Sequence, residues 1–204
     1  MTKTNISIDF ENLVSSDGEI RYHSKFLAPP IADNLYQQLY NQLDWRDETL
    51  TFMGKQVAAP RLVCWYGDSN AVYCYSGVTH KPLQWIPVLS QIKQQICQFS
   101  GCNFNSVLGN LYRNGQDSMG WHADKEKQLG INPVIASLSL GAERLFKLRH
   151  RKNHQTVDIN LEHGSLLIMA GSLQHHWRHC LPKTRRQVTP RINLTFRLII
   201  PDCD

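Results

Sequence analysis

The second half of the sequence consists of short segments in which apolar and polar residues alternate, separated by residues typical of turns. Turn signals stand at Asn114-Gly115, Gly141, Gly164, Gly171 and Pro182. Many short strands at regular spacing predict an antiparallel sandwich or barrel, such as a jelly roll. The expected strands cover residues 107–112, 119–124, 134–140, 144–149, 156–161, 165–169, 173–179 and 191–199.

The first half predicts two helices on either side of an aromatic segment that favours strands. Leu35, Leu39 and Leu43 recur every four residues after Pro29-Pro30, and a second apolar face with helical spacing follows Pro87. Such spacing is typical of amphipathic helices. We expect both helices to pack outside the barrel within a single domain, for which 204 residues suffice.

Composition limits the classes of protein that fit. No apolar run reaches the length of a membrane helix, and the N-terminus lacks the basic and apolar regions of a secretory signal. The six cysteines form no CxxC pair, so we expect reduced thiols in a cytoplasmic protein, nucleoid-associated if prokaryotic and nuclear if eukaryotic. The net charge is +5, and basic clusters at Arg149–Lys152 and Lys183–Arg186 fit either solvated loops or a nucleic-acid surface.

The segment "MGWHADKE" at positions 119–126 has an imidazole and two carboxylates at every second position from residue 122 to residue 126. A strand would point His122, Asp124 and Glu126 to the same side. Trp121 would point to the opposite side, where we expect the core. The three polar residues fit a pair of metal ligands with a substrate-facing acid, or the solvated edge of a sheet.

A third metal ligand is available in "LQHHWRHC" at positions 173–180. If this segment is a strand, His175 and His179 share one face and His176 lies on the other. Two histidines and one carboxylate with open positions are typical of non-haem iron(II) oxygenases. Zinc binding and plain surface polarity are the alternatives, and the alternation does not choose between His175 and His179.

The last predicted strand, "RINLTFRLI", alternates strictly between polar and apolar residues. Arg191, Asn193, Thr195 and Arg197 share one face. That face fits either a half-buried strand in contact with water or a barrel interior that holds an anion. Guanidinium groups bind carboxylates through paired hydrogen bonds, so two arginines on one face suit a dicarboxylate. The dicarboxylate that accompanies an open iron site is 2-oxoglutarate.

An ordered series of motifs resembles the AlkB family of Fe(II)- and 2-oxoglutarate-dependent nucleic-acid dealkylating dioxygenases, most closely its branch acting on duplex DNA. The motifs are "NLYRNG", "GWHADKE", "ASLSLGAERLFKLRH", "LEHGSLLIM", "HHWRHCLP" and "PRINLTFR", and the resemblance covers about residues 52–199. It implies a mainly β fold with flanking helices. A double-stranded β-helix core over residues 106–200 would follow an N-terminal region, residues 1–105, with helices and nucleotide-recognition hairpins.

The resemblance also implies roles for individual residues. The family's distal iron ligand precedes a short turn to proline, which His179 does in "HCLP" and His175 and His176 do not. The implied ligands of Fe(II) are His122, Asp124 and His179. The implied 2-oxoglutarate residues are Arg191 at the far carboxylate, Arg197 near the C1 carboxylate, and Asn193, Asn110 and Tyr112 around them, with O2 as the second co-substrate.

The implied activity is oxidative demethylation of N-alkylated bases such as 1-methyladenine and 3-methylcytosine in DNA, which releases formaldehyde, succinate and CO2. The alkylated base must leave the duplex to be reached. Tyr73, Tyr75 and Ser76 match the family segment that contacts the flipped base, although the tyrosines also suit a core. Glu126 matches a carboxylate that favours a cationic base, and a solvated glutamate is the alternative.

The implied partner is DNA, single- or double-stranded, with RNA as an alternative. Phe52 and Met53 match a hairpin that inserts a wedge into duplexes, and methionine in place of an aromatic residue there favours single strands or a looser flipping mode. The expected contacts to the nucleic-acid backbone are Arg61, Arg149, Arg151, Lys152, Lys183, Arg185 and Arg186. We expect a monomer that binds no membrane.

Two other functions compete with DNA demethylation. One is a related oxygenase that acts on RNA or on a protein side chain. The other is a non-enzymatic jelly-roll binding module with a structural zinc. The open three-ligand set and the arginines of the last strand argue against the zinc module, because a structural zinc needs neither.

Overall fold

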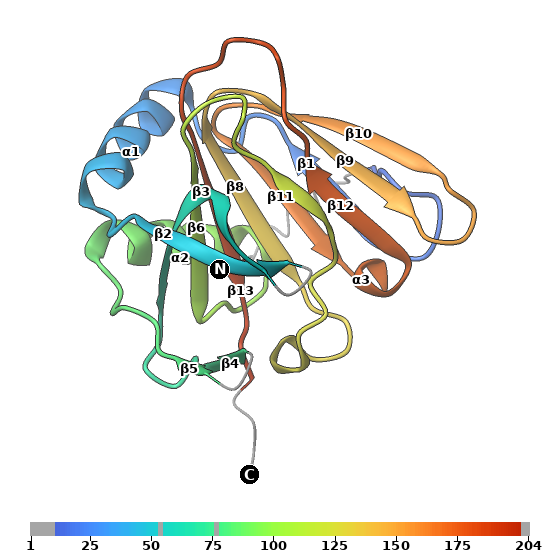
Figure 1. The fold of residues 1–204 in the computed structure, drawn as a ribbon, viewed down its shortest axis with the longest axis horizontal. Coiled ribbons are helices and arrows are strands. Elements are labelled where there is room, and N and C mark those ends of the chain that lie inside the picture. The colour runs from blue at the N-terminus through green and yellow to red at the C-terminus, as the bar shows by residue number, and fades with distance from the viewer. Residues whose placement is uncertain (1–10, 53–54, 76–77, 201–204) are drawn as a thin grey trace, which may run out of the picture.

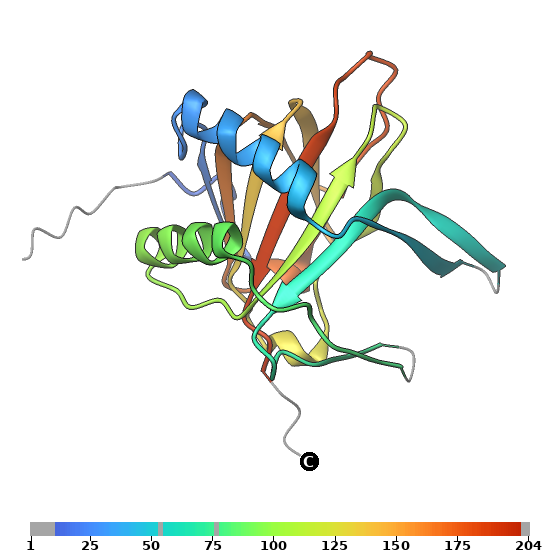
Figure 2. The same cartoon turned by 90° about the vertical axis from the view of Figure 1, so that its left-hand side faces the viewer.

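Two antiparallel sheets face each other in the computed structural model, and helices cover the outer side of one of them (Figures 1 and 2). The structure describes residues 11–52, 55–75 and 78–200, without the side chains of 50–52, 55, 73–75 and 78–80. This architecture confirms the predicted mainly β fold with a jelly-roll core. No helix among these residues is long and apolar enough to cross a membrane.

The larger sheet has the strand order β1-β11-β8-β13-β6-β3-β2, and the smaller sheet has the order β10-β9-β12-β7. The larger sheet contains β1 (Glu19–His23), β2 (Arg46–Phe52), β3 (Lys55–Gly67), β6 (Ser106–Tyr112), β8 (Ile135–Gly141), β11 (Ser165–Ala170) and β13 (Arg191–Arg197). The smaller sheet contains β7 (Met119–His122), β9 (Arg144–His150), β10 (Thr156–Leu161) and β12 (Trp177–Leu181), and β4 (Tyr73–Tyr75) pairs with β5 (Val78–His80). The helices are α1 (Pro29–Gln42), α2 (Pro87–Ser100), α3 (Leu173–His176) and a 3-10 turn at Lys127–Leu129.

Both long helices lie on the outer face of the larger sheet (Figure 2). Each has proline in its first turn, where a missing N–H costs nothing, and α2 ends at Gly101 in the left-handed conformation. Leu39 of α1 and Leu89 and Ile96 of α2 are fully buried, and each contributes about 2 kcal/mol of apolar transfer. Their core extends to Ile192, Leu194 and Phe196 of β13.

Strand β13 is central in the larger sheet and is paired along its length with β6 and β8. Arg191 lies opposite Tyr112 and Gly141, and each following residue as far as Phe196 keeps this register on both sides. The apolar set of β13 therefore faces the helices, while its polar set faces the smaller sheet. This arrangement confirms the buried polar face that the alternation allowed.

The hairpin formed by β2 and β3 projects from the body of the protein (Figure 2). Its register shifts where Asp47 pairs with Leu62 and Thr49 pairs with Ala58, so Glu48 alone opposes residues 59–61. Such an irregularity bends the strand and changes the direction of side chains. The side chain of Phe52, at the end of β2, is not described, and Met53 lies outside the described residues.

Two expectations about the smaller sheet are wrong. Residues 173–179 do not form one strand, because Gly171 adopts a positive φ and the chain makes the single helical turn α3 before β12 begins at Trp177. Trp121 is not in the core, since 47% of it is exposed. It lies on β7, one of the two edge strands of the smaller sheet, and points to the outer face.

Candidate iron and 2-oxoglutarate site

Three predicted iron ligands come together between the two sheets. The donor atoms of His122, Asp124 and His179 all lie within 4.8 Å of one another. His179 on β12 is the register partner of His122 on β7, and their Nε2 atoms are 3.1 Å apart. Asp124 follows the end of β7, where its backbone N–H donates to Oε1 of Gln174 in α3. His175 is exposed and its Nε2 contacts the Ile131 carbonyl, so it is not part of this group.

Hydrogen bonding prepares the first ligand for a metal. His122 Nδ1 lies 2.8 Å from the carbonyl oxygen of Gly120, so Nδ1 must carry the proton and Nε2 keeps its lone pair. Burial lowers the pKa of His179 to about 3, which keeps that imidazole neutral at physiological pH. Neutral imidazole is the form that binds metal ions.

The carboxylate of the group is held in its charged form. Burial by itself would raise the pKa of Asp124, but Arg197, His179 and His122 together outweigh burial, and the pKa lies below its usual value. The Arg197 guanidinium Nη2 donates to Asp124 Oδ1 at 3.1 Å. Two imidazoles and one carboxylate on one side of a metal leave the other positions open, so this donor set fits Fe(II) with bound co-substrates.

The polar face of β13 supplies the cationic part of the site. Arg191 is 2% exposed, donates from Nη2 to Ser139 Oγ at 2.9 Å, and lies over the Tyr112 ring at 5.3 Å. Burial lowers its pKa to about 10, so the guanidinium stays charged at pH 7. Its Nε has no hydrogen-bond partner, and the described ion pairs include none made by Arg191. A buried, unpaired cation calls for an anionic ligand.

The remaining predicted 2-oxoglutarate residues line the same pocket, together with the iron-ligand group. Asn110 Oδ1 accepts a hydrogen bond from Arg61 Nε at 2.8 Å, which leaves the amide NH2 of Asn110 to act as a donor. Asn193 differs, because its amide already donates to Ser137 Oγ and the Leu138 carbonyl. Asn193 therefore shapes the wall of the pocket in this structure.

Arg61 does not lie where a nucleic-acid backbone contact would need it. It is buried, and its guanidinium binds Asn110 and Glu48, the latter at 2.9 Å. The prediction of a phosphate contact is wrong because the irregular pairing of β2 and β3 turns Arg61 inward. Arg61 instead connects the bend of the hairpin to the pocket.

The other predicted substrate residues fall into three groups. Arg149, Lys152, Lys183, Arg185 and Arg186 are exposed, and Arg151 is half-buried. Glu126 is half-buried, and its Oε2 has no hydrogen-bond partner. Tyr73 and Tyr75 lie in β4 without described side chains, and Ser76 lies outside the described residues.

Sequence reasoning missed several residues that build the site. Ser137 and Ser139 support Asn193 and Arg191, and their alternation in "ASLSLG" was an available signal for a polar face. Gln174 and Glu48 gave no such signal. Each lies where the chain departs from regular pairing, in α3 and in the β2 irregularity.

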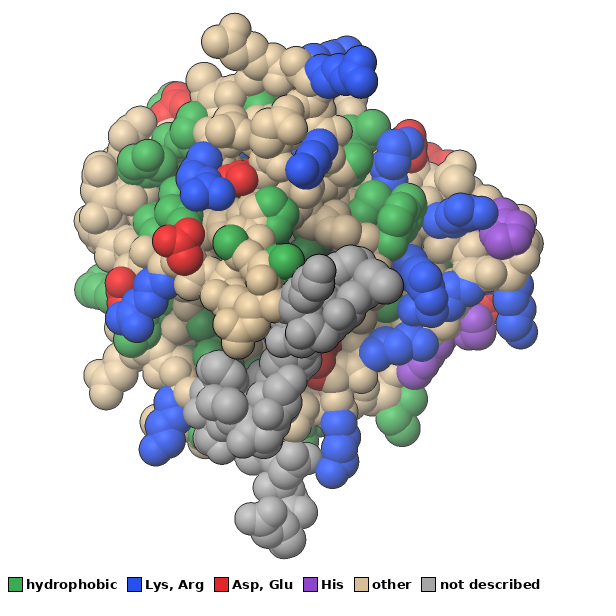
Figure 3. Space-filling model, viewed as in Figure 1, with side chains coloured by type: hydrophobic (Ala, Val, Ile, Leu, Met, Phe, Trp, Pro, Cys, Tyr) green, Lys and Arg blue, Asp and Glu red, His purple; other side chains and the backbone are tan. Residues whose placement is uncertain are grey.

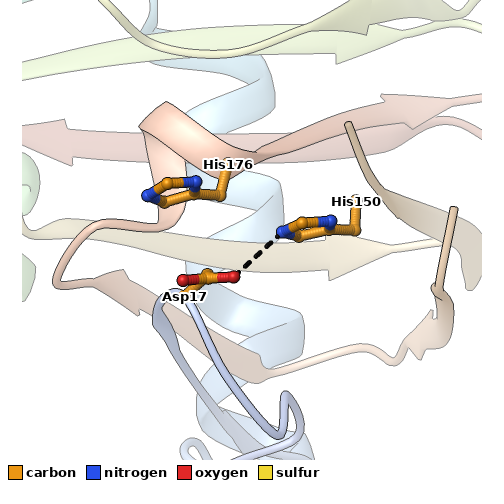
Figure 4. A group of neighbouring side chains, drawn as sticks. All are labelled: Asp17, His150 and His176. Atoms are coloured by element: carbon orange, nitrogen blue, oxygen red, sulfur yellow. Dashed lines mark hydrogen bonds and ion pairs between the residues drawn. The ribbon is translucent and has the colours of Figure 1, made fainter. Parts of the chain in front are cut away.

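A second group of two histidines and one carboxylate lies outside the pocket (Figure 4). Donor atoms of Asp17, His150 and His176 are also within 4.8 Å of one another. His150 Nδ1 accepts backbone N–H bonds from Lys152 and Asn153 at 3.3 and 3.2 Å, so its proton is on Nε2, which donates to Asp17 Oδ2 at 3.2 Å. This histidine has no lone pair to offer a metal, and the group instead joins the N-terminal turn to the β9–β10 turn.

Comparisons with known proteins agree with the geometry. The model of the 2OG-Fe(II) oxygenase superfamily matches residues 19–197, and the chain belongs to this superfamily. Membership implies Fe(II) and 2-oxoglutarate, as predicted, and the group formed by His122, Asp124 and His179 provides a suitable donor set.

Individual relatives narrow the family to AlkB homologues. Alpha-ketoglutarate-dependent dioxygenase alkB homolog 3 of Bos taurus is 43% identical over 84% of this chain and 63% of that protein. DNA oxidative demethylase ALKBH2 of Mus musculus is 38% identical over 83% of this chain and 76% of that protein. The chain thus spans less than two thirds of the cattle protein. A solved structure of OsALKBH1 matches with a TM-score of 0.62 and 18% identity over 88% of this chain and 96% of that chain, which shows the shared fold.

Proposed function

We propose that the protein removes N-alkyl groups, as from 1-methyladenine and 3-methylcytosine, in DNA by oxidative demethylation coupled to 2-oxoglutarate decarboxylation. The observation that carries the proposal is one pocket that joins a metal-ready His–Asp–His group to a buried arginine with no counter-ion among the described residues. The names of the ALKBH2 and alkB homolog 3 relatives support the same chemistry.

The chain's own residues would bind the two co-reactants as follows. His122, Asp124 and His179 would hold Fe(II), which, with 2-oxoglutarate and O2, supplies the oxidation of the N-methyl group. Arg191 would bind the far carboxylate of 2-oxoglutarate. A buried guanidinium positions a carboxylate with paired hydrogen bonds, so Arg191 fixes the distance of the keto acid from the iron ligands.

Arg197 would have a second task beside the metal. Its hydrogen bond to Asp124 Oδ1 orients that carboxylate, and hydrogen bonds of this kind fix metal ligands in other proteins. Its Nε has no partner in this structure and is therefore available to the C1 carboxylate of 2-oxoglutarate.

Glu126 would favour the charge of the alkylated base. Both 1-methyladenine and 3-methylcytosine are cations at neutral pH, and the Oε2 of Glu126 has no protein partner. The oxidised methyl group then leaves as formaldehyde and restores the base. Exposed cations at Arg149, Lys152, Arg185 and Arg186 would bind phosphates and make affinity fall steeply with salt. A monomer suffices, because every residue of the site comes from one chain.

The test is turnover that depends on substrate. Protein loaded anaerobically with Fe(II) and 2-oxoglutarate is given O2, and succinate and formaldehyde are measured with a 3-methylcytosine DNA oligonucleotide and with the same sequence unmodified. We expect the alkylated oligonucleotide to stimulate both products in equal amounts. Succinate without formaldehyde from either strand would contradict the proposal, and greater stimulation by the matching RNA would assign the activity to RNA.

A further inference from the structure

The outer face of the smaller sheet is open and basic. Among the described residues no long helix lies over this sheet in Figure 1, and Lys, Arg and His side chains gather over β9, β10 and β12 in Figure 3. Arg178 is exposed between the inward-facing Trp177 and His179, so it points outward. Arg149 is its register partner on β9 and is also exposed.

This pair of arginines is unfavourable in the absence of an anion. Like charges directly opposite each other on neighbouring strands destabilise a sheet. Lys147 is paired with Asp158 at 2.5 Å, but the described ion pairs include none made by Arg149 or Arg178. Within the part of the chain that the structure describes, the Arg149 guanidinium donates to His154 Nδ1 at 3.2 Å. An anionic ligand between the two guanidinium groups would remove the repulsion.

A groove with one aromatic wall lies beside these cations. It is lined by Trp121 from β7, by Lys147 and Arg149 from β9, and by His154, Thr156 and Asp158 from the β9–β10 hairpin. Trp121 is the largest of its exposed hydrophobic residues, with 47% of the residue accessible. An exposed indole next to unpaired guanidinium groups is the combination that single-stranded nucleic-acid sites use.

The strand β7 separates this groove from the iron-ligand group, because Trp121 lines the groove and His122 lines the pocket. β7 is an edge strand, with no further strand beyond it in the described sheet. His122 faces the inner side and is 34% exposed, while Trp121, the residue before it, faces the outer side. Because neighbouring residues of a strand are about 3.3 Å apart, a chain with one base at His122 has to cross only this edge to reach Trp121.

We propose that this groove binds an unpaired nucleotide adjacent to the alkylated base, with its base stacked on Trp121 and its phosphate between Arg149 and Arg178. The inference rests on the proposed function. An unpaired base is required, because the faces of a base inside a duplex are already stacked on its neighbours. The site would therefore add affinity for single strands.

The test compares Trp121→Ala and Trp121→Phe with wild type. Binding of single-stranded DNA of about twelve nucleotides with a central 3-methylcytosine is measured by fluorescence anisotropy without O2, alongside the fully paired duplex. Since stacking on an aromatic contributes about 1–3 kcal/mol per base, Trp121→Ala should weaken single-strand binding about tenfold. Duplex binding should change less than twofold, and Trp121→Phe should restore most of the affinity.

Kinetics and a matched control separate binding from damage to the iron ligands. Trp121→Ala should raise KM for the single strand about tenfold and leave KM for 2-oxoglutarate within twofold. Tyr40, an exposed aromatic residue on α1, provides the control, and Tyr40→Ala should change neither value.

Equal losses on single strand and duplex, or no loss on either, would overturn the inference. So would a wild-type dimer that Trp121→Ala converts to monomers, because the groove would then be a subunit interface. These failures are distinguishable from failure of the proposed function. In that case the wild-type protein itself would release no formaldehyde from any alkylated strand.

Discussion

The described residues contain two groups of two histidines and one carboxylate, and these groups differ in the hydrogen bond made by Nδ1 of one histidine. In the first group His122 Nδ1 donates to a carbonyl, so Nε2 faces Asp124 and His179 with a lone pair. In the second, His150 Nδ1 accepts two backbone N–H bonds, so Nε2 faces Asp17 with a proton. Residue types and distances are alike, and the hydrogen bond on the opposite nitrogen decides which group can bind a metal.

The surroundings of the two carboxylates also favour metal binding by the first group. Asp124 is buried and accepts from Arg197, whereas 45% of the Asp17 side chain is exposed. Water can solvate Asp17 without a metal. A buried carboxylate such as Asp124 stays charged only with cations around it, and Arg197 is the one that the structure shows.

The largest expected effect is on metal binding by the two groups. His179→Ala should abolish substrate-stimulated succinate formation, because the ligand set falls to two. His176→Ala should retain most of the activity. Manganese stoichiometry, measured by paramagnetic resonance in place of iron, should fall from one to zero only in His179→Ala. A loss of metal in His176→Ala would break the distinction between the groups.

The second largest effect is expected for Arg191, the buried cation that lines the pocket of the first group. Arg191→Ala should raise the 2-oxoglutarate concentration needed for half-maximal turnover about 100-fold, since a buried charge-assisted pair is lost. The 2-oxoglutarate dependence of succinate release measures this change. Arg186→Ala, which removes an exposed cation, is the control and should leave the requirement unchanged. If both variants needed the same 2-oxoglutarate concentration, Arg191 would not be the residue that binds the far carboxylate.

A smaller effect should come from Arg61, which orients an amide of the pocket. Arg61→Gln should raise the 2-oxoglutarate requirement about tenfold, because Asn110 loses the donor that holds its Oδ1. Asp47→Asn changes an exposed carboxylate next to Glu48 and serves as the control. Weaker oligonucleotide binding with an unaltered 2-oxoglutarate requirement would return Arg61 to its predicted role at the nucleic acid.

The smallest effect is expected in the second group. Asp17→Asn should lower the free energy of unfolding in urea by about 1 kcal/mol or less, because a partly exposed hydrogen bond to a charged acceptor is weakened. Manganese stoichiometry should stay at one. If wild type bound two ions and Asp17→Asn bound one, the tautomer assigned to His150 would be wrong.

Local patterns predicted the parts of this molecule that are regular. The alternation of "RINLTFR" gave the two faces of β13, and the spacing of Leu35 and Leu39 gave the buried side of α1, because regular pairing or winding fixes each side chain's direction. The sequence pattern predicted that two histidines and one carboxylate would form the metal site. The choice of His179 over His175 came from the family resemblance. The two-residue periodicity of a strand could not decide it, because α3 interrupts the predicted strand at residues 173–176.

Other expectations failed where the direction of a side chain depends on distant parts of the chain. Trp121 would be core if another layer covered the smaller sheet, and nothing in "MGWHADKE" says whether one does. Arg61 faces inward because three residues of β3 oppose Glu48 alone. Both outcomes are set by neighbouring strands, which the local alternation does not describe.

The uninterrupted pairing of β13 restricts how the length of this protein can change. Every residue from Arg191 to Phe196 is matched on both sides, so inserting or deleting one residue would exchange its two faces. The arginines would then enter the helix-covered core and the phenylalanine would enter the pocket. A substitution in this strand changes one side chain, whereas a change in length keeps the register only outside the strand, as in residues 183–189, which join no sheet.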